Sequence, residues 1–143
     1  MDKIVDILLA EDNLSDVVLL REALQNTDWK YRLHVTRDGV EALDFLGRRD
    51  DHSDAPLPGL IVLDLNLPKK TGFEVLTEIR GIPFLSSIPV IILSGSEWER
   101  SAAAASGFPE ESYIVKPMTY SGSIEVAKRI ENLWRMSTGN KGT

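Results

Sequence analysis

The chain alternates between short apolar runs and segments in which apolar residues recur at helical spacing. The short runs have the length and composition of strands, and they lie at residues 4–10, 31–36, 60–64, 90–93 and 113–115. Between and after them, apolar residues line one face of a predicted helix, at residues 17–24, 40–46, 75–79, 97–106 and 120–134. Five strands that alternate with five helices are typical of an α/β fold with a parallel sheet.

The third strand is predicted to lie in the centre of this sheet. Residues 60–63 are all apolar and end in Asp64, and such continuity indicates burial on both faces. The alternating pattern of residues 31–36 is instead that of a half-buried edge strand. The common five-stranded doubly wound order is the flavodoxin-like 2-1-3-4-5. We therefore predict a flavodoxin-like (βα)5 domain over residues 1–136, with residues 137–143 as a flexible polar tail.

Turn and capping signals support these boundaries. Asp38 with Glu41, and Thr71 with Glu74, have the three-residue spacing of a helix-capping pair. Residues 49–59 are polar and contain two prolines, so they are predicted to form a surface loop.

The composition excludes several classes of function. There is no cysteine among the 143 residues, so thiol nucleophiles and thiolate metal sites are excluded. The net charge of −6 argues against a nucleic-acid partner, because binding to a phosphate backbone requires a basic face. The N-terminus has no signal-peptide pattern, and no apolar run is long enough to cross a membrane. We expect a cytoplasmic protein with no membrane partner.

Polar residues follow the predicted strands directly. In chain order, the five strand ends hold Glu11 with Asp12, Asp38, Asp64, Ser94 and Lys116. Ligands of such sheets bind just beyond the carboxyl ends of the strands, so all but Asp38 are expected to meet in one crevice. Two unit charges ~4 Å apart repel by about 4 kcal/mol at an effective dielectric constant of 20. Three clustered carboxylates therefore require a cation or raised pKa values.

The predicted chemistry is phosphoryl transfer to Asp64. The cluster offers oxygen ligands without histidine or cysteine, which favours Mg²⁺. Asp64 would attack phosphorus as a nucleophile, while Lys116 and Ser94 stabilise the transition state. Taken singly, each residue has an ordinary structural role in a turn, a cap or the surface. The prediction depends on four chemically matched strand ends.

These residues resemble the receiver domains of two-component response regulators, over about residues 6–134. Glu11 and Asp12 resemble the acidic pair of that family, and Asp64 resembles its phosphoacceptor. Further matches are Pro68 and Gly72 at the family's spacing after Asp64, Ser94 as the family's hydroxyl residue, and Lys116 with Pro117 as its Lys-Pro pair.

The resemblance implies a cofactor and a phosphoryl donor. Mg²⁺ would be bound by the side chains of Asp12 and Asp64, by Glu11 through water, and by the backbone carbonyl of Asn66. The donor would be a sensor histidine kinase. Asn66 and Ser96, which would flank the acyl phosphate, are predicted to set its lifetime.

The resemblance also implies a conformational switch. Tyr113 occupies the aromatic switch position and would turn inward when Ser94 moves to meet the phosphoryl oxygens. The peptide bond between Lys116 and Pro117 would be cis, which is plausible because proline lowers the cost of that isomer to about 0.5–1 kcal/mol.

A narrower resemblance concerns single-domain receivers that serve bacteriophytochrome kinases. It is based on the run LDLNLPKKTG, the long polar loop before residue 60 and the closing NLW. Ser94 in place of threonine, and the segment AAAASGFPEES, depart from that pattern. We expect no further domain after Trp134, so the signal is expected to leave by protein contact or onward phosphotransfer. The fourth helix, fifth strand and fifth helix form the candidate output surface and dimer interface.

Three other functions are considered. A hydrolase with an Asp-x-Asp loop needs a general acid and base two residues after the nucleophile, where this chain has Asn66. A flavodoxin-like nucleotide binder needs a phosphate loop after the first strand, where Glu11 and Asp12 would repel an anion. A degenerate receiver would act only as an interaction module, but the set of site residues is complete.

Overall fold

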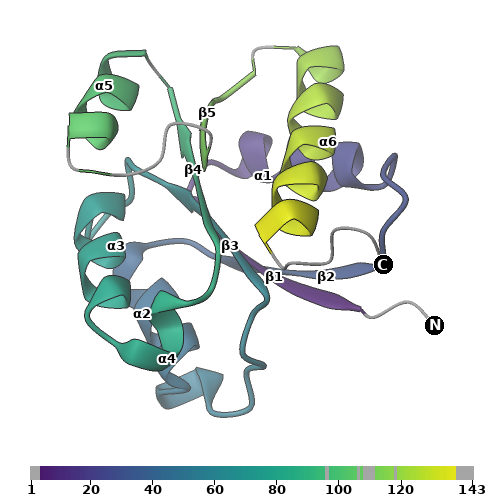
Figure 1. Ribbon diagram of the computed structural model, residues 1–143. Coiled ribbons are helices and arrows are strands. Elements are labelled where there is room, and N and C mark those ends of the chain that lie inside the picture. Colours follow the sequence, from purple (N-terminus) through teal and green to yellow (C-terminus); the bar gives the residue numbers. More distant parts are fainter. Residues whose placement is uncertain (1–3, 96, 106, 108–111, 118, 138–143) are drawn as a thin grey trace.

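Five parallel strands form one sheet in the computed structural model, which describes residues 4–95, 97–105, 107, 112–117 and 119–137. The strands are β1 (Val5–Ala10), β2 (Tyr31–Thr36), β3 (Leu60–Asp64), β4 (Val90–Ser94) and β5 (Tyr113–Val115). Their order is β2-β1-β3-β4-β5, so the predicted flavodoxin-like topology is confirmed (Figure 1). All five residues of β3 are buried, because this central strand is covered on both faces.

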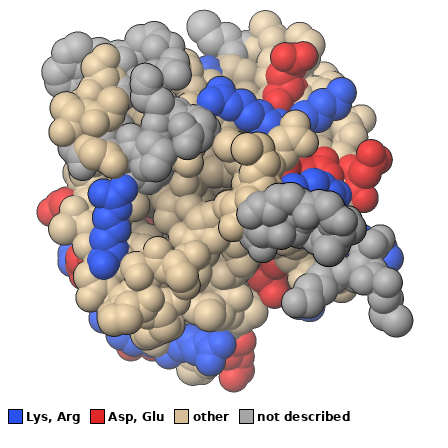
Figure 2. Space-filling model, viewed as in Figure 1, with Lys and Arg blue, Asp and Glu red and all other residues tan. Residues whose placement is uncertain are grey.

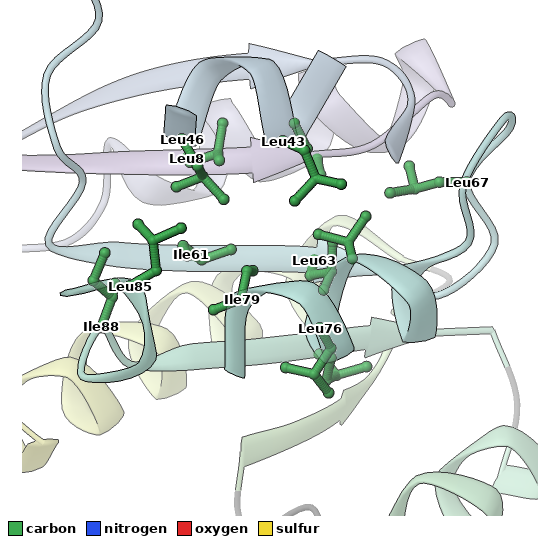
Figure 3. Close-up of a cluster of buried hydrophobic side chains, with 14 of the residues drawn as sticks. Leu8, Leu43, Leu46, Ile61, Leu63, Leu67, Leu76, Ile79, Leu85 and Ile88 are labelled. Carbon is green, nitrogen blue, oxygen red and sulfur yellow. The ribbon is translucent and has the colours of Figure 1, made fainter. Parts of the chain in front are cut away.

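Helices cover both faces of the sheet. They are α1 (Leu14–Leu24), α2 (Gly39–Gly47), α3 (Gly72–Arg80), α4 (Pro83–Ser86), α5 (Glu97–Ala105) and α6 (Tyr120–Ser137). Helices α1 and α6 pack on one face, and α2, α3 and α4 pack on the other (Figure 1). Each face has its own buried apolar cluster; the one beneath α2 and α3 appears in Figure 3.

Local hydrogen bonds explain where the helices begin. Thr71 and Glu74 form the predicted reciprocal capping box of α3. Asp38 accepts from the Glu41 backbone N–H at 2.7 Å, but Glu41 reaches the N–H of Arg37 rather than that of Asp38. Asn13 caps α1, so this helix begins earlier than its apolar pattern indicated.

The structure adds details that the apolar pattern did not predict. The long polar loop contains a short 3-10 helix at Asp50–His52, and α4 precedes β4. Helix α6 extends through Ser137, one residue beyond the predicted end of the domain, and the rest of the predicted tail lies outside the described residues. No helix within the described ranges is long and apolar enough to cross a membrane.

Strand register brings the strand ends to one edge of the sheet. Asp64 on β3 lies opposite Leu93, and Ser94 on β4 lies opposite Val115. The backbone N–H of Lys116 donates to the carbonyl of Ser94 at 2.6 Å, so the pairing continues past the end of β5. Residues that are up to 105 positions apart, from Glu11 to Lys116, therefore meet in one place.

Candidate functional site

Lys116 contacts three carboxylates of the site. Its Nζ lies 2.7 Å from Glu11 Oε1, 3.0 Å from Asp64 Oδ2 and 3.0 Å from Asp16 Oδ2. Burial lowers the pKa of Lys116, but its bonds to Glu11, Asp16 and Asp64 outweigh this effect and raise the pKa above its usual value. The ammonium group is therefore permanently charged at neutral pH.

Glu11 is a buried carboxylate of the site whose pKa is raised. It is 1% exposed, and burial together with the nearby Asp64 raises its pKa to about 7. Lys116 and the backbone N–H of Asn13 act in the opposite direction. Burial and the nearby Asp64 outweigh these two effects, so the pKa of Glu11 stays raised.

Three carboxylates have the geometry for a divalent cation. Glu11, Asp12 and Asp64 each offer an oxygen, and these oxygens lie within 4.8 Å of one another. Oxygens on opposite sides of an octahedral Mg²⁺ lie about 4 Å apart. Glu11 Oε1 is buried and lies 2.7 Å from the Lys116 ammonium. The donor set thus fits a hard cation, and the backbone carbonyl of Asn66 stays a predicted fourth ligand.

Asp64 is held in position by its neighbours. It is 2% exposed, its Oδ2 faces Lys116, and its Oδ1 accepts from the backbone N–H of Asn66 at 3.1 Å. The carboxylate is therefore oriented before any phosphoryl donor arrives.

Glu99 connects two residues of the predicted site. Its Oε1 accepts a short hydrogen bond from the buried Ser94 hydroxyl, and its Oε2 accepts from Asn66 Nδ2 at 2.8 Å. Sequence reasoning missed Glu99 because it is in a helix rather than at a strand end. It also missed Asp16, although Asp16 is the acidic residue in the first turn of α1.

The other predicted residues are placed as follows. Tyr113 is 2% exposed and belongs to the core beneath α2 and α3, so it is already turned inward. The Lys116–Pro117 bond is trans, so the predicted cis bond is wrong; trans is the lower-energy isomer for X-Pro bonds. Asp38 caps α2, and its Oδ2 lies 3.6 Å from Lys69 Nζ. Ser96 lies outside the described residues.

Gly72 allows α3 to begin directly against Asp64. A Cβ at this position would lie 2.5 Å from the Asp64 carbonyl oxygen and 2.7 Å from the Leu65 Cα. The Gly72 N–H donates to the Leu65 carbonyl at 3.0 Å, which keeps this close contact in place. The glycine that follows Asp64 at the family's spacing is therefore required for packing.

We expect Gly72→Ala to destabilise the protein by about 1–3 kcal/mol, because the clashing atoms are backbone and cannot rotate away. Urea denaturation measures this change. Gly81→Ala is the matched control, since its Cβ would meet nothing closer than 3.6 Å and its φ of −83° suits alanine. Equal stability of the two variants would contradict the packing role of Gly72.

Together the fold and the site define a class of protein: a doubly wound α/β domain with an acidic cluster suited to a cation and a buried aspartate paired with a half-buried lysine at one sheet edge. The chain belongs to the response regulator receiver domain family, whose sequence model matches residues 7–128.

Relatives of known structure have the same fold over nearly the whole chain. The response regulator Rcp1 of Synechocystis sp. is 38% identical over 90% of this chain and 87% of its own length. The crystal structure of its Mn²⁺-bound form has a TM-score of 0.79 at 36% identity, covering 91% of this chain and 94% of that one. The phosphorylated cyanobacterial phytochrome response regulator RcpA has a TM-score of 0.81 at 38% identity, with 92% and 94% covered.

Proposed function

We propose that this protein is a response regulator that accepts a phosphoryl group on Asp64 in a Mg²⁺-dependent reaction. The observation that supports this most directly is the pairing of the buried Asp64 with Lys116 beside the oxygens of Glu11 and Asp12. The phosphorylated state of RcpA and the Mn²⁺ in Rcp1 are properties of those relatives that agree with the proposal.

The chemical step is displacement at phosphorus. An oxygen of Asp64 forms the new bond, the bond between phosphorus and the leaving group breaks, and that group departs with the electron pair. Asp64 then carries a mixed anhydride, the acyl phosphate. Asp12, Asp64, Glu11 and the backbone carbonyl of Asn66 would hold Mg²⁺. When bound, the cation would neutralise part of the negative charge on the phosphoryl oxygens. Lys116 contributes a fixed positive charge 3.0 Å from Asp64 Oδ2.

The partner in this proposal is a sensor histidine kinase of the phytochrome class. This assignment comes from the names of the relatives, which include phytochrome and bacteriophytochrome response regulators. Phosphotransfer from such a kinase would take place in the cytoplasm. In our proposal the protein is not a turnover enzyme, because Asn66 replaces the acid and base that fast hydrolysis needs, and Asn66 and Ser96 set the lifetime of the acyl phosphate.

Output is proposed to pass through protein contacts made by α5, β5 and α6, including a homodimer interface. A groove lined by β5 and α6 residues lies on this surface. The net charge of −6 disfavours a nucleic-acid partner. On the one face drawn in Figure 2, the described Lys and Arg side chains are spread out among neutral and acidic ones.

The proposal is tested with acetyl phosphate and Mg²⁺. We expect intact-mass spectra to show one added phosphoryl group, and we expect chelation of the cation with EDTA to prevent its addition. An unmodified wild-type protein at saturating donor and cation would overturn the proposed function.

A further inference from the structure

Glu99 lies where α5 meets the ends of two central strands. It is the third residue of α5, and its half-buried carboxylate bonds both to Ser94 at the end of β4 and to Asn66 just after β3. One helix side chain therefore joins the end of β4 to the segment that directly follows Asp64.

The Ser94 hydroxyl has only one proton to donate. Ser94 is fully buried, and in this structure its proton is directed at Glu99 Oε1. A hydroxyl that donates to Glu99 is not available as a donor to a phosphoryl oxygen on Asp64. Glu99 and the phosphoryl group therefore compete for the same hydrogen bond.

Charge repulsion disfavours Glu99 in this competition. The site already contains the carboxylates of Glu11, Asp12 and Asp64, and among the described residues Lys116 is the ammonium group that contacts Glu11 and Asp64. A phosphoryl group adds further negative charge close to Ser94, and like charges in a partly buried site repel strongly. The arrangement with Glu99 in contact with Ser94 is therefore disfavoured once Asp64 is phosphorylated.

We propose that Glu99 is a positioning residue that acts as a latch: it holds Ser94 and Asn66 in the unphosphorylated arrangement and must release Ser94 when Asp64 is phosphorylated. This inference depends on the proposed function of Asp64. Because Glu99 belongs to the first turn of α5, its release removes the hydrogen bond that ties this turn to Ser94 at the end of β4. The latch thus converts the phosphoryl charge into a change at α5.

The test compares phosphorylation rates of wild type, Glu99→Gln and Glu99→Ala with acetyl phosphate and Mg²⁺. We expect Glu99→Ala to be phosphorylated about tenfold faster, since a charge-assisted hydrogen bond no longer has to be broken. Glu99→Gln should be intermediate, because a neutral amide is a weaker acceptor of nearly the same shape. The matched control is Glu22→Ala, which removes the same charge from the exposed end of α1.

A double-mutant cycle distinguishes the latch from a general charge effect. In a Ser94→Ala background, Glu99→Ala should give little or no further acceleration, because there is no hydroxyl to release. An equal acceleration in both backgrounds, or none in the wild-type background, would overturn the latch. If wild type itself takes up no phosphoryl group, the proposed function fails as well, and this outcome is distinct from the other two.

Discussion

Asp64→Asn is expected to abolish phosphoryl uptake completely. The amide that replaces the carboxylate cannot form an acyl phosphate, and Asp64 is the carboxylate that lies between Lys116 and the backbone N–H of Asn66 at the end of the central strand β3. Intact-mass spectra after incubation with acetyl phosphate and Mg²⁺ measure the effect. The variant should remain at its unmodified mass when the wild type has gained one phosphoryl group.

The matched control for this experiment is Asp38→Asn. Asp38 also follows a strand, but its side chain caps α2, and asparagine is an equally good cap. This variant should take up one phosphoryl group as wild type does. A phosphorylated Asp64→Asn protein, or an unreactive Asp38→Asn protein, would show that the acceptor has been assigned to the wrong strand end.

The positions of Asp64, Glu11, Asp12, Ser94 and Lys116 could be predicted because they depend only on strand order. An apolar run such as residues 60–63 can be buried on both faces only in the middle of a sheet, and the residue after it must then lie at the carboxyl edge. The register of β1, β3, β4 and β5 confirms this placement.

Other features depend on packing that strand order does not determine. The sequence predicts a helix from residue 97, where α5 begins, but it does not determine how the first turn of that helix packs against the end of β4, which is what brings Glu99 to Ser94. The isomer of the Lys116–Pro117 bond rests on a difference of about 0.5–1 kcal/mol, which the sequence does not reveal. Tyr113 is turned inward because it packs in the core beneath α2 and α3. It has this position while Ser94 is still bonded to Glu99, whereas the resemblance to receiver domains implies it only after Ser94 moves.

Lys116→Met is expected to slow phosphoryl uptake by on the order of 100- to 1000-fold, the usual cost of removing a preorganised group that stabilises charge in a transition state. Lys116 contacts Glu11, Asp16 and Asp64, so its loss leaves all three carboxylates without their shared counter-charge. Methionine retains most of the apolar length of lysine, which keeps the effect electrostatic. Initial rates with acetyl phosphate at saturating Mg²⁺ measure it, and Lys30→Met, at an exposed position before β2, is the control.

The pH dependence of Mg²⁺ binding is a second measurement that distinguishes Lys116→Met from the wild type. In the wild type the pKa of Glu11 is raised to about 7, so Glu11 is protonated below that pH and ionised above it. Affinity for Mg²⁺ should therefore fall as pH decreases through about 7, by up to about tenfold per pH unit, because a cation binds the ionised carboxylate. Lys116 lowers the pKa of Glu11, so its removal should raise that pKa and shift the loss of affinity to more alkaline pH. The measurement is the Mg²⁺ affinity of both proteins between pH 6 and pH 9. If affinity is lost at the same pH in both, Lys116 does not influence the pKa of Glu11. The slow uptake would then arise from the phosphoryl step alone.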